Sequence, residues 1–207
     1  MTSYRGVRLD RPTRGDIHAI YSDPRVWKHL PSGQFSDLSQ TERMVNGRIE
    51  GWTRDHLSSW VLRDEETGDV IGNAGCSLRR NTFWNLGYRL APEFQGRGVA
   101  AWASREAIDA AHRVRPEIPV VAYLLEHNAA SAHVATGVGL ALVHRCPDAG
   151  NPDPSAIRLV FADHQADPQK GRAEAERLIT QEKVALIIKN SSQGARLSYR
   201  SHMLCLK

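Results

Sequence analysis

The stretch Gln95-Gly96-Arg97-Gly98-Val99-Ala100 separates a strand-like run, 84–90, from a helix-like run, 99–113. Its two glycines allow a positive φ and a close approach of the backbone to a ligand. The first N–H groups of a helix have no acceptor within it, and the helix dipole favours an anion at that end. The stretch therefore predicts a phosphate-bearing ligand that is held mainly by main-chain N–H groups.

Three other interpretations of this stretch were weighed. No Lys-Ser or Lys-Thr follows the last glycine, which excludes a nucleoside triphosphatase P-loop. A dinucleotide-binding turn tolerates Ala101 in its last place, but it follows a buried parallel strand. The preceding run contains Trp84, Asn85, Tyr88 and Arg89, which suits an exposed or antiparallel strand better. A glycine turn that merely opens a helix stays possible.

The composition indicates one globular domain. The chain has 207 residues, of which 41% are hydrophobic, and no apolar run approaches the ~20 residues of a membrane span. No apolar core follows the first residues, so no signal peptide is expected. Three scattered cysteines indicate reduced thiols and a cytoplasmic protein. The scattered histidines have no metal-ligand spacing, so no metal site is expected.

The charge distribution divides the chain into two parts. Residues 170–207 hold eight basic and three acidic residues, a net charge of +5, whereas residues 1–169 are near neutral with a net charge of −1. We expect a catalytic domain at 1–169 and a basic C-terminal extension of unknown role at 170–207. The neutral part shows no electrostatic footprint for nucleic acid, so no nucleic-acid partner is expected.

The order of predicted elements indicates an α/β fold with a mixed, mostly antiparallel sheet flanked by helices. A capping signature at Thr13–Asp16 predicts a helix through about Ser22, and a capping box at Ser39–Glu42 predicts a helix through about Arg54. Strands are predicted at 7–9, 58–63, 70–79, 83–90, 120–125 and 157–162, and a second helix after Asn128 reaches about Thr136.

Two motifs in order carry a family resemblance. Gln95-x-x-Gly98-x-Ala100 is followed by Asn128-x-x-Ser131 and then by Val138-Gly139-Leu140. This pattern resembles the GNAT superfamily of acyl-CoA-dependent N-acetyltransferases. The runs 23–27 and 84–92 look like its ribosomal-protein-alanine acetyltransferase branch, and the resemblance covers roughly residues 4–164.

The resemblance implies acetyl-CoA as co-substrate and assigns its contacts. The pyrophosphate would lie on the main-chain N–H groups of Gln95, Gly96, Arg97, Gly98, Val99 and Ala100. The Arg97 side chain either pairs with a phosphate or is a solvated loop residue. The strand end at Tyr88, Arg89 and Leu90 would pair with the pantetheine arm through its backbone. Asn128 would hydrogen-bond the same arm, and it is also a good helix N-cap.

Acetyl transfer from a thioester to an amine needs few protein groups. The resemblance makes Ser131 the candidate to protonate or hydrogen-bond the departing sulfur. Glu126 is the candidate base, acting directly or through water, although an exposed strand-end charge is the alternative. The chain departs from the family pattern at Ala132, where a basic residue is common, and no tyrosine stands near 143–146.

The resemblance points to a protein N-terminal amine or a small-molecule amine as acceptor. The segment 21–35 and the tryptophans Trp27, Trp52 and Trp60 are the candidate walls of its site, or else core residues. A non-catalytic acyl-CoA-binding module is the alternative function. No membrane partner is expected, and a homodimer is possible.

Overall fold

A computed structural model describes the backbone of residues 3–13, 16–147 and 157–162, and the side chains of this part up to residue 142. The chain forms two compact units that divide between Val120 and Val121. The extension predicted at 170–207 lies outside the described residues.

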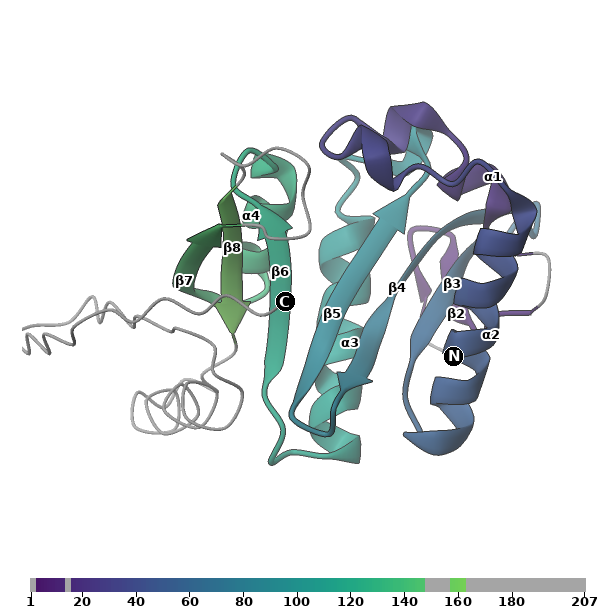
Figure 1. The fold of residues 1–207 in the computed structure, drawn as a ribbon. Helices are drawn as coiled ribbons and strands as arrows, with labels where there is room; N and C mark the ends of the chain where they lie inside the picture. Colours follow the sequence, from purple (N-terminus) through teal and green to yellow (C-terminus); the bar gives the residue numbers. More distant parts are fainter. Residues whose placement is uncertain (1–2, 14–15, 148–156, 163–207) are drawn as a thin grey trace, which may run out of the picture. The chain divides into compact units, whose positions relative to one another are not determined.

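The first unit is built on five antiparallel strands in the order β1-β2-β3-β4-β5 (Figure 1). The β4–β5 pairing runs without interruption from Gly72–Leu90 to Arg79–Phe83, whereas β3 shifts register against β4 between Leu62 and Arg63. The strands are β1 (Ser3–Tyr4), β2 (Val7–Asp10), β3 (Ser59–Asp64), β4 (Val70–Arg79) and β5 (Phe83–Leu90).

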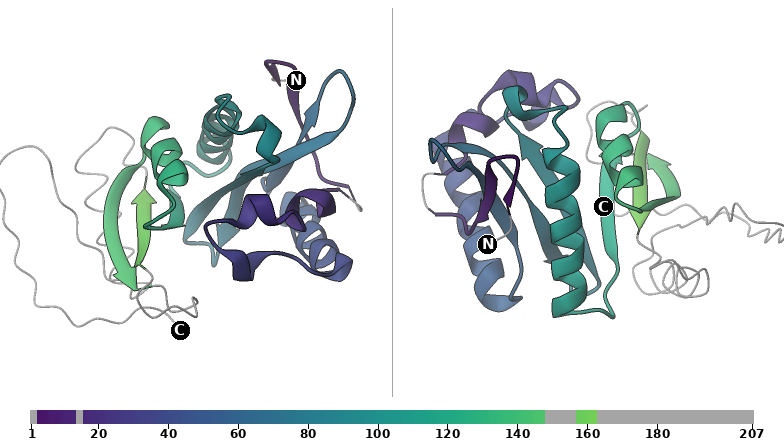
Figure 2. Two further views of the ribbon diagram at one scale, coloured as in Figure 1. Left: turned by 90° about the horizontal axis from the view of Figure 1, so that it is seen from above. Right: turned by 180° about the vertical axis from the view of Figure 1, so that it is seen from behind.

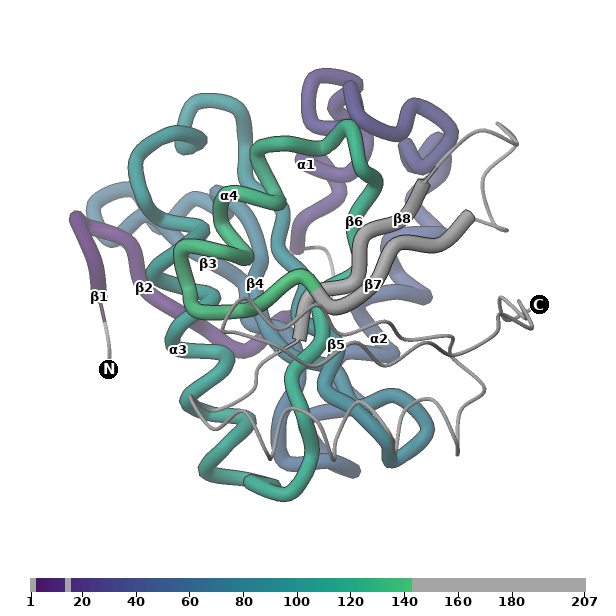
Figure 3. Tube along the Cα trace, turned by 90° about the vertical axis from the view of Figure 1, so that its left-hand side faces the viewer, coloured from purple at the N-terminus to yellow at the C-terminus, as the bar shows by residue number. Residues whose placement is uncertain are grey.

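Helices cover both faces of these strands. Long helices α2 and α3 lie on opposite sides of the sheet, with α1 and the first 3-10 turns on the α2 side (Figures 2 and 3). The helices are α1 (His18–Tyr21), η1 (Pro24–Trp27), η2 (Pro31–Gly33), α2 (Leu38–Arg54), η3 (Pro92–Phe94) and α3 (Val99–Val114). Buried alanines at 103, 107 and 111 give α3 a small-residue face that packs closely on β4 and β5.

Each face of the sheet has its own hydrophobic core. Because successive strand residues point to opposite faces, the neighbours Val61 and Leu62 belong to different cores. The α3 side buries Val7, Leu62, Ile71, Ala74, Leu90, Val99, Trp102 and Ala103. The α2 side buries Ile17, Ile20, Tyr21, Val26, Trp27, Val45 and Val61.

The second unit contains β6 (Val120–Leu125) from Val121 onward, α4 (Ala129–Gly137), β7 (Ala141–Pro147) and β8 (Ile157–Ala162). Its strands pair antiparallel in the order β6-β8-β7, and α4 packs on β7. The predicted strands at 70–79, 83–90, 120–125 and 157–162 are thereby confirmed.

Two predicted helix starts were wrong. The Asp16 carboxylate accepts hydrogen bonds from the N–H and the hydroxyl of Thr13, both at 2.7 Å, and so closes a turn. Ile17 then adopts a left-handed φ of 81°, and α1 begins only at His18. The capping box of α2 joins Asp37 and Gln40, so this helix begins at Leu38 and Ser39 lies inside it.

Within the described part of the chain, no helix is both long and apolar enough to cross a membrane. The same residues contain no group of three or more His, Cys, Asp or Glu side chains placed to hold a metal ion. Burial raises the pKa of the Cys76 thiol well above its usual range, which suits a core residue rather than a nucleophile.

Candidate active site

The turn between η3 and α3 has the geometry that its glycines predicted. Gly96 and Gly98 adopt left-handed φ values of 71° and 80°, and Gly98 is the N-cap of α3. No side chain caps this helix end, so the N–H groups of its first turn remain for a ligand. A Cβ atom on Gly96 would meet nothing within 4 Å, which leaves open space at the turn. This geometry fits an anion that is bound by main chain.

Side chains from two segments fix the turn. Gln95 donates from Nε2 to the carbonyl oxygen of Leu90 at 3.1 Å, which ties the turn to the end of β5. Arg5, in the β1–β2 turn, donates to the carbonyl oxygen of Arg97 at 3.2 Å. The Arg97 guanidinium lies 5.1 Å from the Phe94 ring centroid and is exposed. Two exposed cations, Arg5 and Arg97, therefore lie at this turn.

Residues at the end of β5 direct their side chains to both faces of the sheet. Leu90 is buried in the core on the α3 side, and Tyr88 packs against the same core. Arg89 points the other way, with its guanidinium carbon 3.4 Å from the Trp27 ring centroid and 5.2 Å from that of Tyr21. Its Nη1 donates to the Val26 carbonyl oxygen at 2.8 Å. Arg89 thus connects β5 with the segment before α2.

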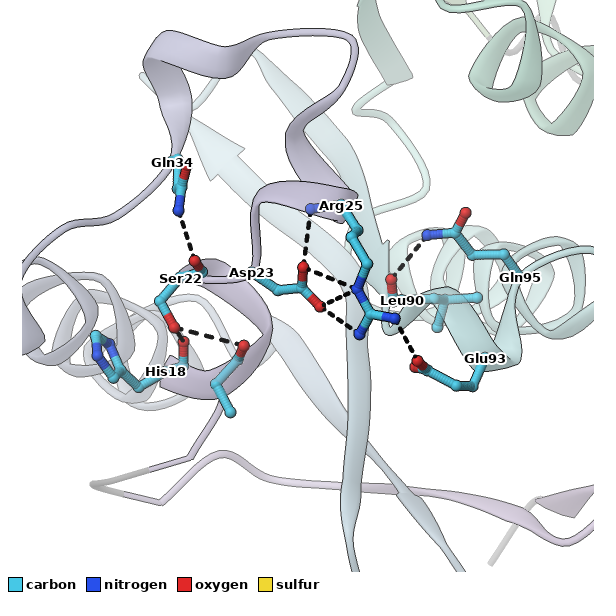
Figure 4. Close-up of polar contacts among 9 residues, drawn as sticks. His18, Ser22, Asp23, Arg25, Gln34, Leu90, Glu93 and Gln95 are labelled. Carbon is cyan, nitrogen blue, oxygen red and sulfur yellow. Dashed lines mark hydrogen bonds and ion pairs between the residues drawn. The ribbon is translucent and has the colours of Figure 1, made fainter.

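An exposed charge network joins this segment to the turn (Figure 4). The Arg25 guanidinium contacts the Asp23 carboxylate at 2.7 Å and Glu93 of η3 at 2.8 Å. Hydrogen bonds from Arg25 lower the pKa of Asp23, and the backbone N–H of Glu93 together with Arg25 lowers the pKa of Glu93. The Arg25 and Glu93 side chains are more than half exposed, so the pair contributes little to stability. Its geometry nevertheless positions the segment beside the turn.

The segment 21–35 has a largely aromatic interior. Tyr21 contacts the rings of Trp27 and Phe35, with centroids 5.8 and 4.9 Å away. Trp27 is buried and donates from Nε1 to the Tyr21 carbonyl oxygen at 2.7 Å. Trp52 and Trp60 form a separate pair at 5.5 Å. Of the three tryptophans proposed as walls, Trp27 thus belongs to the core of the segment itself.

The second unit holds the remaining predicted residues. The Asn128 carboxamide oxygen accepts the N–H of Ser131 at 3.1 Å and caps α4, so Asn128 has the N-cap role that its residue type favours. Glu126 is exposed directly after β6, and Ser131 is half-buried in the first turn of α4.

The structure thus groups the predicted residues within each unit. Tyr88 to Ala100 form one continuous strand end, turn and helix start, and Asn128 and Ser131 share a helix start. Sequence reasoning missed the side-chain contributions of Arg5 and Arg25, which come from separate segments. These contacts could be predicted only from knowing which strands and helices are neighbours.

Comparison with known proteins connects this geometry to a family. Residues 7–141 match the family model described as the acetyltransferase (GNAT) domain. The chain belongs to this family. The resemblance inferred from the sequence and the predicted fold class are both confirmed, and this GNAT protein is an acetyltransferase that uses acetyl-CoA.

Individual relatives of the GNAT acetyltransferase are distant. The uncharacterized protein YkkB of Bacillus subtilis (strain 168) is 28% identical over 124 residues, which are 58% of this chain and 71% of YkkB. An acetyltransferase from Agrobacterium tumefaciens str. C58 superposes with a TM-score of 0.63 at 26% identity, covering 79% of this chain and 94% of that one.

A third protein shares the fold at lower identity. RimL, a ribosomal L7/L12 α-N-protein acetyltransferase solved in complex with coenzyme A, superposes with a TM-score of 0.63 at 18% identity. The match covers 77% of this chain and 94% of RimL.

Proposed function

We propose that this GNAT acetyltransferase transfers the acetyl group of acetyl-CoA to a primary amine, either a protein N-terminal amine or a small-molecule amine. The observation that supports this proposal best is the Gln95–Ala100 turn. Its left-handed glycines open α3 at a helix end that no side chain caps. A protein N-terminal acceptor is also what the name of RimL states for that neighbour.

The residues of the turn suit a pyrophosphate. In this proposal the N–H groups of Gly96 to Ala100 donate to its oxygens, where the dipole of α3 adds to the attraction. The Gln95 N–H is already donated to the Pro92 carbonyl oxygen at 3.2 Å, so Gln95 contributes through its side chain, which positions the turn. Arg97 and Arg5 supply positive charge from the exposed side.

The pantetheine arm is assigned to the β5 backbone at Tyr88, Arg89 and Leu90, and to Asn128. β4 occupies one edge of β5 through the pairs Ala74–Tyr88, Asn73–Arg89 and Gly72–Leu90. The arm would therefore use groups on the other edge of β5. Asn128 retains its amide N–H groups as donors, since its carboxamide oxygen caps α4.

The chemistry requires one proton to leave the amine and one to reach the sulfur. Bound acetyl-CoA supplies an activated thioester carbonyl that a neutral amine attacks directly. We assign the amine proton to the exposed carboxylate of Glu126, reached directly or through water. The Ser131 hydroxyl donates a hydrogen bond to the departing sulfur, whose thiol pKa of ~8.5 makes strong acid assistance unnecessary.

The test is thiol release from acetyl-CoA by the full chain with a panel of amines and N-terminal peptides, using a blocked turn as the variant. Gly98→Trp places a side chain where even a Cβ would lie 3.0 Å from the Tyr4 hydroxyl. Gly68→Trp is the matched control, because Gly68 also has a left-handed φ, of 77°, and a Cβ there meets nothing within 4 Å.

We expect acceptor-dependent thiol release to survive in Gly68→Trp. In Gly98→Trp the KM for acetyl-CoA should rise about tenfold or more. Equal KM values for acetyl-CoA in the two variants would show that the turn does not bind acetyl-CoA. Tight acetyl-CoA binding without release across the panel would instead indicate a non-catalytic binding module.

A further inference from the structure

Two arginines from different elements converge on the side chain of Tyr21. Arg48, on α2, donates from Nη2 to the Tyr21 hydroxyl at 2.8 Å, and its guanidinium carbon lies 5.5 Å from the ring centroid. Arg89, on β5, lies over the same ring and over Trp27. Two positive charges are therefore held near one buried tyrosine.

Neither charge has a carboxylate partner in the part of the chain whose side chains are described. There, the ion pairs of Arg8, Arg25, Arg54, Arg63 and Arg115 each reach an aspartate or glutamate, and none involves Arg48 or Arg89. Arg48 Nη1 and Arg89 Nε are buried and have no hydrogen-bond partner. Buried charged donors without acceptors are costly, so an anionic acceptor at these atoms would be favourable.

The neighbouring polar groups cannot supply that anion. The Tyr21 hydroxyl donates to the Asn73 carboxamide oxygen at 3.1 Å, and Asn73 donates from Nδ2 to the Ser59 hydroxyl at 3.2 Å. The hydrogen bonds thus run from Arg48 through Tyr21 and Asn73 to Ser59. Burial lowers the pKa of Arg89, the contact with Tyr21 opposes this shift, and the charge of Arg48 adds a smaller lowering.

The position of the pair connects it with the proposed chemistry. Arg89 lies between Tyr88 and Leu90, the residues whose backbone is assigned to pantetheine, and the Leu90 carbonyl holds Gln95 of the phosphate turn. The side chain of Arg89 faces the segment 21–35, which is the proposed acceptor wall. Arg48 and Arg89 are both half-buried, so part of each side chain remains accessible from solvent.

We propose that Arg48 and Arg89 together bind a carboxylate of the acceptor, so that the substrate is an amine that also bears a carboxylate. A guanidinium presents its N–H groups in a fork that matches a carboxylate, and an anion between two such groups relieves their repulsion. The inference rests on the proposed amine acetylation. It selects amino acids or peptides with an acidic residue near the amine over polyamines and neutral amines.

The test compares acceptors that differ only in the carboxylate. Free amino acids are paired with their α-amides, and C-terminally blocked Ala-Asp peptides are paired with Ala-Asn peptides, so that the two arms separate a main-chain from a side-chain carboxylate. The variants are Arg48→Gln, which removes the charge, and Arg48→Lys, which keeps the charge without the fork. Arg43→Gln is the control, because Arg43 is exposed on the same helix.

In one of the two pairs of acceptors, the acid should have a higher kcat/KM than its amide. Arg48→Gln should lower kcat/KM for that acid about 10- to 100-fold and leave kcat/KM for the amide unchanged. Arg48→Lys should fall between, and Arg43→Gln should match the unmodified protein. Equal kcat/KM values for acids and amides in both pairs would overturn the inference. So would an Arg48→Gln variant that loses the same activity with acid and amide. The acetyltransferase activity would stand in either case.

A binding measurement keeps the two proposals distinct if no acceptor is turned over. The melting temperature is measured with acetyl-CoA and each acid or amide present, because a ligand that binds the native state raises it. The carboxylate site is supported, even without turnover, if the acids raise the melting temperature and the amides do not. Arg48→Gln should abolish that rise. No difference between acids and amides rejects the site.

Discussion

Asp16 shows how one residue replaces an expected helix start with a turn. It is nearly buried. Its carboxylate accepts a hydrogen bond from Thr13 and forms an ion pair with Arg63 of β3 at 2.7 Å. Burial alone would raise the pKa of Asp16, but the hydrogen bonds from Thr13 and Arg63 outweigh it and lower the pKa. The charged form of Asp16 therefore stabilises the folded state.

A pH-dependent loss of stability follows from this lowered pKa. The contribution is fully present above the unfolded pKa of ~3.9 and disappears as the pH falls through the lower folded value. Asp16→Asn should reduce the free energy of unfolding by about 1–3 kcal/mol near neutral pH, with a smaller difference at more acidic pH. Urea denaturation across this range measures it, with Asp109→Asn, exposed on α3, as control. A difference that grows on acidification would contradict the assignment.

At the scale of the elements, β4 approaches β3 too closely at Gly75 to leave room for a Cβ atom. A Cβ there would overlap Ser59 Cα and lie 2.6 Å from the Ser58 carbonyl oxygen. Gly75→Ala should therefore cost about 1–3 kcal/mol, because backbone atoms would have to move apart. Its register partner Gly87 has nothing within 4 Å, so Gly87→Ala should change stability by less than about 0.5 kcal/mol.

Denaturant midpoints of the two alanine variants measure this contrast. Because both glycines are replaced by the same residue in paired strands, differences in strand propensity largely cancel. Equal destabilisation of the two variants would show that the close approach to Ser59 is relieved without cost.

Strands and glycine turns could be predicted from the sequence because their signals are local. β4 and β5 follow from two runs rich in apolar residues around the turn at Asn81, and the φ values of Gly96 and Gly98 follow from residue type. The start of α2 could not, because Asp37 and Ser39 both suit a cap and only the bonds formed choose between them. Arg89 was expected to contribute only its backbone, and its side-chain pairing with Arg48 could not be predicted, because only tertiary packing brings a helix and a strand to the same tyrosine.

At the scale of the whole molecule, the charge division still predicts that activity resides in residues 1–169. The family match at 7–141 lies entirely within that range. A chain that ends at residue 169 should keep the kcat/KM of the full protein. It should also lose any salt-sensitive retention on nucleic acid, because the removed part carries a net charge of +5. Steady-state kinetics and retention at two salt concentrations test this, and lost turnover would make the extension part of the enzyme.

The uninterrupted register of β5 against β4 restricts insertions and deletions in this strand during evolution. Inserting or deleting one codon in the strand would exchange its two faces, placing arginine in the core of the α3 side and an apolar residue against Trp27. In the proposed assignment, acetyl-CoA and the acceptor would both lose their contacts with β5 in a single step. New specificities are therefore expected to arise in this strand by substitution, whereas the turn at 80–82 before it can change in length without shifting the register of β5.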